Sequence, residues 1–139
     1  MLLMKLVIIS FDEPFFIPLL FKPLFKSYPE LIKAVIIIPQ TTGRKGLINF
    51  VKKQLSIAGP TAFAIKGFEY LIFRVGTILG ILDKSLVSLA RKRNISLFYT
   101  NSINDKKTAK VLKKIMPDYV ITQVPEKIEN NILKLARVG

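Results

Sequence analysis

Asp12 and Glu13 are the only adjacent acidic residues in the chain, and paired carboxylates are one starting point for acid–base chemistry. An apolar segment with helical spacing follows them, so we interpret the two acids as loop and helix N-terminal charges rather than a catalytic dyad. The chain contains no cysteine and no histidine. Thiolate chemistry, zinc–thiolate sites and the commonest general base are therefore excluded. We predict no catalytic residue and no metal site within these residues.

Two short segments resemble phosphate loops only superficially. The segment "SFDEPF" follows the first apolar run but has no glycine, so it lacks a dinucleotide-binding fingerprint. The segment "TTGRKG", residues 41–46, does not have the Gly-x-x-x-x-Gly-Lys-Ser/Thr spacing. We interpret it as a basic surface turn.

The charge balance favours acidic partners. Lysine and arginine total 22 against 9 acids, which gives a formal net charge of +13. An anionic membrane surface, a phosphorylated substrate or nucleic acid would each suit this charge. Basic and aromatic residues do not alternate as they do on surfaces that bind single strands, so nucleic acid is less favoured.

Four apolar runs rich in β-branched residues predict strands at residues 4–10, 31–39, 95–100 and 118–122. Helices are predicted at 15–26 after Pro14, at 106–115 behind an Asn104-Asp105 cap, and at 126–137 opened by Pro125. Alternation of strand and helix predicts an α/β fold: a Rossmann-like, open, mainly parallel sheet with helices on both faces. We expect the strand order 3-2-1-4.

Residues 43–83 form a basic, apolar helical insert between the second and third strands. Lys66, Glu69 and Arg74 interrupt any window long enough to span a membrane. Two alternatives remain for residues 60–82: helices packed on the sheet or on a partner subunit, or helices lying in an anionic membrane interface. In either case we expect one buried face, made of Phe63, Phe68, Leu71, Ile72, Val75, Ile78, Leu79 and Leu82. We expect the apolar start of the chain to be a buried strand rather than a signal peptide, since Lys5 interrupts it. We expect a cytoplasmic protein, or one peripheral to the membrane.

Three segments, taken in order, resemble the N-terminal half of the folate-dependent formyltransferases, the family of methionyl-tRNA and glycinamide ribonucleotide formyltransferases. They are "MKLVIISFDEPFFIPLL", "RNISLFYTNSINDKKTAKVLKKIMPDYVIT" and "PEKIENNILKLARVG". The resemblance covers both ends of the chain but not the insert. It implies transfer of a formyl group from 10-formyltetrahydrofolate to a primary amine, borne by a sugar nucleotide, a tRNA or another small molecule.

The family's catalytic Asn-x-His and its later Asp have no matching position here, so residues 1–139 are expected to be a partial N-terminal domain, ending just before the active-site strand. We expect this polypeptide alone to be inactive. By the resemblance, the loop after the fourth strand walls the formyl-folate pocket, which makes Gln123, Val124 and Pro125 candidate cofactor-binding residues. Ser10, Phe11 and Asp12 lie where open α/β sheets bind ligands, so they are candidate substrate-binding residues.

Two other classes of protein remain open. One is a non-catalytic Rossmann-like binding domain that docks on a membrane or a partner through its insert. The other is a glycosyltransferase-like N-terminal domain.

Overall fold

The computed structural model describes residues 4–13, 16–39, 43–78 and 85–137. Its centre is a four-stranded parallel sheet with the order β3-β2-β1-β4. The strands are β1 (Leu6–Phe11), β2 (Ile32–Ile38), β3 (Ser96–Tyr99) and β4 (Tyr119–Gln123). The predicted α/β fold and strand order are confirmed, and each strand lies within two residues of its predicted bounds.

Burial follows position in the sheet. The central strand β1 is closed to solvent on both faces, and Val7, Ile8 and Ile9 are 0% exposed. A run of β-branched residues without alternation suits such a strand because both faces need apolar cover. The edge strands β3 and β4 are only half-buried, with exposed and intermediate positions along their length.

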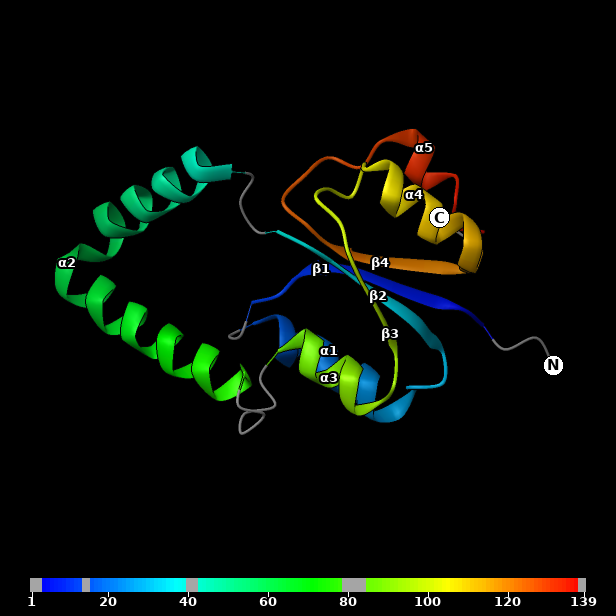
Figure 1. Ribbon diagram of the computed structural model, residues 1–139, viewed down its shortest axis with the longest axis horizontal. Coiled ribbons are helices and arrows are strands. Elements are labelled where there is room, and N and C mark those ends of the chain that lie inside the picture. The colour runs from blue at the N-terminus through cyan, green and yellow to red at the C-terminus, as the bar shows by residue number, and fades with distance from the viewer. Residues whose placement is uncertain (1–3, 14–15, 40–42, 79–84, 138–139) are drawn as a thin grey trace.

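Two helical layers cover the sheet (Figure 1). On one face lie α1 (Ile17–Ser27) and α3 (Leu86–Lys92), whose apolar residues share a core with Leu6, Ile8 and Val35. On the other face lie α4 (Lys106–Ile115) and α5 (Asn130–Leu133), which pack with Val7, Ile9 and Ile36. The five lysines of α4 are all exposed, as its amphipathic pattern predicts.

Helix α1 begins two residues later than predicted. Phe16 is its N-cap residue, and the side chain of Glu13 accepts hydrogen bonds from the N–H groups of Phe16 (2.8 Å) and Ile17 (3.3 Å). The prediction that Glu13 is a helix N-terminal charge is therefore confirmed. Pro14, the predicted opening residue, lies outside the described residues. The helix continues through Pro23 to Ser27.

The last helix is much shorter than predicted: α5 covers Asn130–Leu133, not residues 126–137. The reason is that polar groups of the loop after β3 hold residues 126–129 in a non-helical path, as described below. Pro125 therefore does not open a helix.

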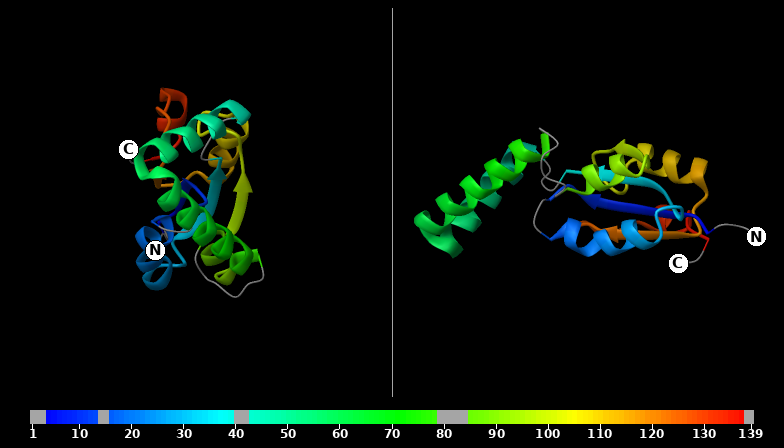
Figure 2. Two further views of the ribbon diagram at one scale, coloured as in Figure 1. Left: turned by 90° about the vertical axis from the view of Figure 1, so that its left-hand side faces the viewer. Right: turned by 90° about the horizontal axis from the view of Figure 1, so that it is seen from below.

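The insert contains α2 (Gly43–Ile78), which is divided at Gly59. Gly59 has φ of 77°, a conformation that glycine adopts readily, and Pro60 follows it at the start of the second arm. Both arms project away from the sheet beyond the carboxyl ends of the strands (Figures 1 and 2).

Among its described residues, the insert's predicted apolar face does not pack on the sheet, and its cover by a partner subunit or a membrane interface stays a prediction. Phe68, Leu71, Ile72 and Val75 are all at least half exposed, and Phe63 is half-buried. The face stays open because the second arm does not lie against the sheet. Leu79 and Leu82 lie outside the described residues, as does the side chain of Ile78. Within the described residues, no helix combines the length and apolarity needed to cross a membrane.

Candidate functional site at the switch point of the sheet

The topology reverses between β1 and β4. The chain builds β1, β2 and β3 outward in one direction, and then places β4 on the other side of β1. After β1 the chain leads to α1 on one face of the sheet, and after β4 it leads to α5 on the opposite face. Loops that diverge in this way leave a crevice at the carboxyl ends of the strands, which is where open α/β sheets bind ligands.

The two predicted site segments meet at this point. Ser10 of β1 is in register with Gln123 of β4. The Ser10 hydroxyl lies 3.3 Å from the carbonyl oxygens of both Phe11 and Gln123, and its side chain is buried. A hydroxyl has one proton, so at any moment it donates to one of these two carbonyl oxygens. Ser10 therefore joins the two strand ends beneath the surface at the switch point.

Phe11 and Asp12 turn toward the layer of α1 and α3. Phe11 packs, partly buried, against the core of that layer. The Asp12 carboxylate accepts a hydrogen bond from the N–H of Leu86 at 3.1 Å, in the first turn of α3. A carboxylate is stabilised at a helix N-terminus by the free N–H groups and the helix dipole. Asp12 is thus a helix N-terminal charge, as predicted, but on a helix that begins more than seventy residues later.

Gln123, Val124 and Pro125 turn toward the other layer. Val124 is half-buried against the core beneath α4, whereas Gln123 and Pro125 are exposed. The two exposed side chains lie at the carboxyl edge of the sheet, and the half-buried valine anchors the loop. Of the six predicted residues, Asp12, Gln123 and Pro125 are the ones accessible to a ligand.

Asn104 clamps the loop after β4 to the loop after β3. Its amide nitrogen donates to the carbonyl oxygen of Lys127 at 2.8 Å, and its amide oxygen accepts from the N–H of Glu129 at 2.9 Å. The Glu126 carboxylate accepts from the Ser102 hydroxyl and from the N–H of Ile103. These contacts hold Glu126 and Lys127 outside the helix that the sequence predicts.

Sequence reasoning missed this clamp. It assigned Asn104-Asp105 together as a helix cap, but only Asp105 caps α4, accepting from the N–H of Lys107 at 3.2 Å. The adjacent polar residues Asn101, Ser102 and Asn104 were the available signal. Such residues commonly bond to nearby backbone, and here the partners lie on a distant loop.

A pair of threonines makes the floor of the β3 loop rigid. The Thr108 hydroxyl lies 2.8 Å from the Thr100 hydroxyl and 2.8 Å from the carbonyl oxygen of Ser102. Both threonine side chains are buried. No buried side-chain nitrogen or oxygen in the described parts of the chain lacks a hydrogen-bond partner. The loop after β3 is therefore held in place by hydrogen bonds that are already satisfied.

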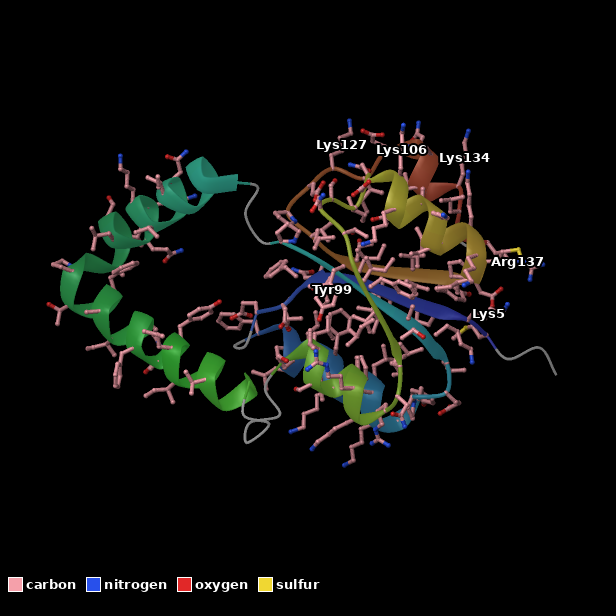
Figure 3. All side chains as sticks on the ribbon, viewed as in Figure 1. Lys5, Tyr99, Lys106, Lys127, Lys134 and Arg137 are labelled. Atoms are coloured by element: carbon pink, nitrogen blue, oxygen red, sulfur yellow. The ribbon has the colours of Figure 1, made fainter. Side chains whose placement is uncertain are left out.

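A shallow hollow of about 350 Å³ lies elsewhere, at the amino end of the sheet. Three of its lining residues are the basic Lys113, Lys134 and Arg137, and Figure 3 shows Lys134 and Arg137 beside α4 and α5. Arg137 lies 3.5 Å from the Asp118 carboxylate. None of the six predicted site residues lines this hollow, so it is separate from the switch point.

No protein-family model matches the chain, and no curated protein matches it either.

Proposed function

We propose that this domain is the N-terminal part of a formyltransferase that moves a formyl group from 10-formyltetrahydrofolate to a primary amine. The observation that carries the proposal is the register between Ser10 of β1 and Gln123 of β4. It brings the predicted substrate-binding segment, residues 10–12, and the predicted cofactor-binding segment, residues 123–125, to the same switch point. The strand order 3-2-1-4 and the sequence resemblance at both ends of the chain support it.

The roles proposed for these residues are positioning and binding. Gln123 and Pro125 would contact the folate, with Val124 anchoring their loop. Asp12 would face the amine from the other side of the crevice, while Ser10 and Phe11 hold the end of β1 in place. The formyl-transfer intermediate is an oxyanion, and its stabilisation by the family's Asn-x-His has no matching residues among these 139.

The direct test is binding of 5-formyltetrahydrofolate, a stable analogue of the donor, followed by backbone amide NMR of the whole chain. We expect saturable shifts centred on residues 10–12 and on residues 123 and 124, since Pro125 has no N–H. Shifts centred on the hollow at Lys113 and Arg137, or no shifts at all, would contradict the proposal.

A matched pair of variants sharpens this test. Gln123→Trp places a bulky ring at the crevice, and Tyr99→Trp places one at the carboxyl end of β3, the opposite edge strand. Both wild-type side chains are exposed, so both variants should fold. We expect Gln123→Trp to weaken folate binding roughly tenfold or more by blocking contact area, and Tyr99→Trp to leave it unchanged.

A docking role is the second candidate function, and the exposed apolar surface of α2 favours it. The same titration separates the two functions, because a docking domain without folate chemistry would give no saturable shift at the switch point.

A further inference from the structure

Helix α2 exposes more apolar surface than a helix in water normally does. Phe68 is 66% exposed and Leu71 61% exposed. A contiguous apolar surface of this kind marks an interaction site. The folate proposal does not use it.

The second arm of α2 is amphipathic. The exposed residues Ile65, Phe68, Leu71, Ile72 and Val75 recur at spacings of three and four, which places them on one side of a helix. Lys66 lies on the opposite side together with Phe63 and Tyr70, and it forms a solvent-exposed ion pair of 2.8 Å with Glu69 at the flank of the stripe. The arm therefore has an exposed apolar stripe, with its charged residues outside that stripe.

The first arm repeats this arrangement. Ile48, Val51 and Leu55 are exposed and share one side, which Lys52 flanks, while Asn49 and Lys53 lie on the other side with the exposed Ile57. The helix is broken at Gly59 and Pro60. The two arms are therefore separate helical segments rather than one straight helix.

The charge of α2 is almost entirely positive. Its one acidic residue is Glu69, which is paired with Lys66. Its basic residues are Arg44, Lys45, Lys52, Lys53, Lys66 and Arg74. A second copy of the chain would bring the same basic residues to the contact and a net charge of +13, so charge opposes self-association.

We propose that α2 docks the protein on an anionic lipid surface, with its apolar stripes in the interface and its basic residues toward the headgroups. An amphipathic helix with aromatic and aliphatic residues on one face and lysines on the other binds in this way. The charged side of each arm would stay in the headgroup layer, because burying it in hydrocarbon is costly.

Docking would also orient the sheet. Helix α2 follows β2 and precedes α3 in the chain, and it lies beyond the carboxyl ends of the strands (Figures 1 and 2). A chain docked through α2 therefore holds the carboxyl edge of the sheet nearest the lipid. Phe16, Leu19 and Leu20 of the α1 start are exposed at the same edge and would extend the apolar surface.

The test is flotation of the whole chain with vesicles of phosphatidylcholine alone and with vesicles that also contain phosphatidylglycerol. We expect binding to the anionic vesicles, little binding to the neutral ones, and loss of binding as sodium chloride is raised. Reversing Lys52 and Lys53 to Glu should weaken binding roughly fivefold or more for each residue. Equal binding to both kinds of vesicle, or none to either, would overturn the proposal.

Paired substitutions test the apolar stripe. Phe68→Asp with Leu71→Asp should weaken binding to anionic vesicles roughly a hundredfold, since two large apolar side chains no longer enter the interface. The control, Met116→Asp with Leu133→Asp, adds the same charge at exposed apolar positions outside α2 and should change binding several-fold at most. Equal losses in the two variants would overturn the assignment of α2.

Sedimentation of the chain without lipid tests the alternative that a second copy of the chain covers α2. A wild-type dimer that the Phe68→Asp, Leu71→Asp variant converts to a monomer, with no vesicle binding by either, would show that a second copy covers α2. That result would replace the lipid proposal. Circular dichroism of both paired variants should match the wild type, because every substituted side chain is exposed.

Discussion

Strand β1 and helix α2 are both rich in apolar residues, yet the fold treats them in opposite ways. Leu6 to Ile9 of β1 are almost completely buried, between two helical layers and two neighbouring strands. Most apolar residues of the second arm of α2 face solvent. The difference teaches that an apolar sequence predicts that a segment will be shielded from water. It does not identify whether the same chain or a partner shields it. For β1 the cover comes from the same chain, and for α2 we propose that it comes from lipid.

Truncation of a large aromatic in each region gives the largest expected contrast. Phe25 is 2% exposed in the core beneath α1, and Phe25→Ala should lower the free energy of unfolding by about 3–5 kcal/mol. Phe68→Ala should change it by less than about 0.5 kcal/mol, because that side chain has little cover to lose. Urea unfolding followed by circular dichroism measures both. A similar cost at the two positions would show that α2 is packed in solution.

Removal of the loop clamp should give the next largest effect. Asn104→Ala deletes the two bonds to Lys127 and Glu129 and should cost about 1–2 kcal/mol. Amide hydrogen exchange should also quicken at residues 126–129. The control is the exposed Asn49→Ala in α2, which should leave exchange at residues 126–129 unchanged and leave stability unchanged or slightly raised, since alanine is the better helix former. If exchange at residues 126–129 stays slow in Asn104→Ala, the clamp does not hold that loop.

Loss of a helix cap should have a smaller effect. Asp105→Ala removes the carboxylate that accepts from Lys107 at the start of α4, and should lower stability by about 1 kcal/mol. Ser56→Ala in the first arm of α2 should be neutral or slightly stabilising, since alanine is the better helix former. Thermal melts of the two variants compare them. A loss in Ser56→Ala equal to that in Asp105→Ala would mean that Ser56 has a structural role.

The exposed ion pair of α2 should give the smallest effect. The Lys66 and Glu69 side chains are 71% and 41% exposed, so Glu69→Gln should cost no more than about 0.5 kcal/mol. The difference should disappear when salt is added, because solvent-exposed charges are screened. A larger, salt-resistant cost would indicate that the pair is covered in solution.

Regular elements with strong patterns were predictable from the sequence. The four strands, their order and the amphipathic α4 follow from β-branched runs, helical spacing and the usual handedness of crossovers. Glu13 was also predictable as a helix N-terminal charge, because its partners lie only three and four residues away. The placement of Ser10 beside Gln123 followed once the strand order was correct.

Interactions between distant segments were not predictable in this way. Asn104 looks like half of a helix cap until the loop that carries Lys127 and Glu129 is placed beside it. The same contacts shorten α5, because a local pattern suited to helix competes with polar bonds that form only in the folded chain. Asp12 likewise accepts a hydrogen bond from the first turn of α3, a helix whose start is distant in sequence and near in space.

By itself, the sequence determined the α/β architecture, the basic charge and the amphipathic character of the insert. Each of these depends on residue type and local spacing, which are complete before the chain folds. Only the tertiary structure decided that Ser10 is buried and Phe11 partly buried at the switch point, that Asn104 joins two loops, and that α2 projects with its apolar stripe uncovered. The physical reason is that burial and hydrogen-bond partnership depend on which distant groups share the same space.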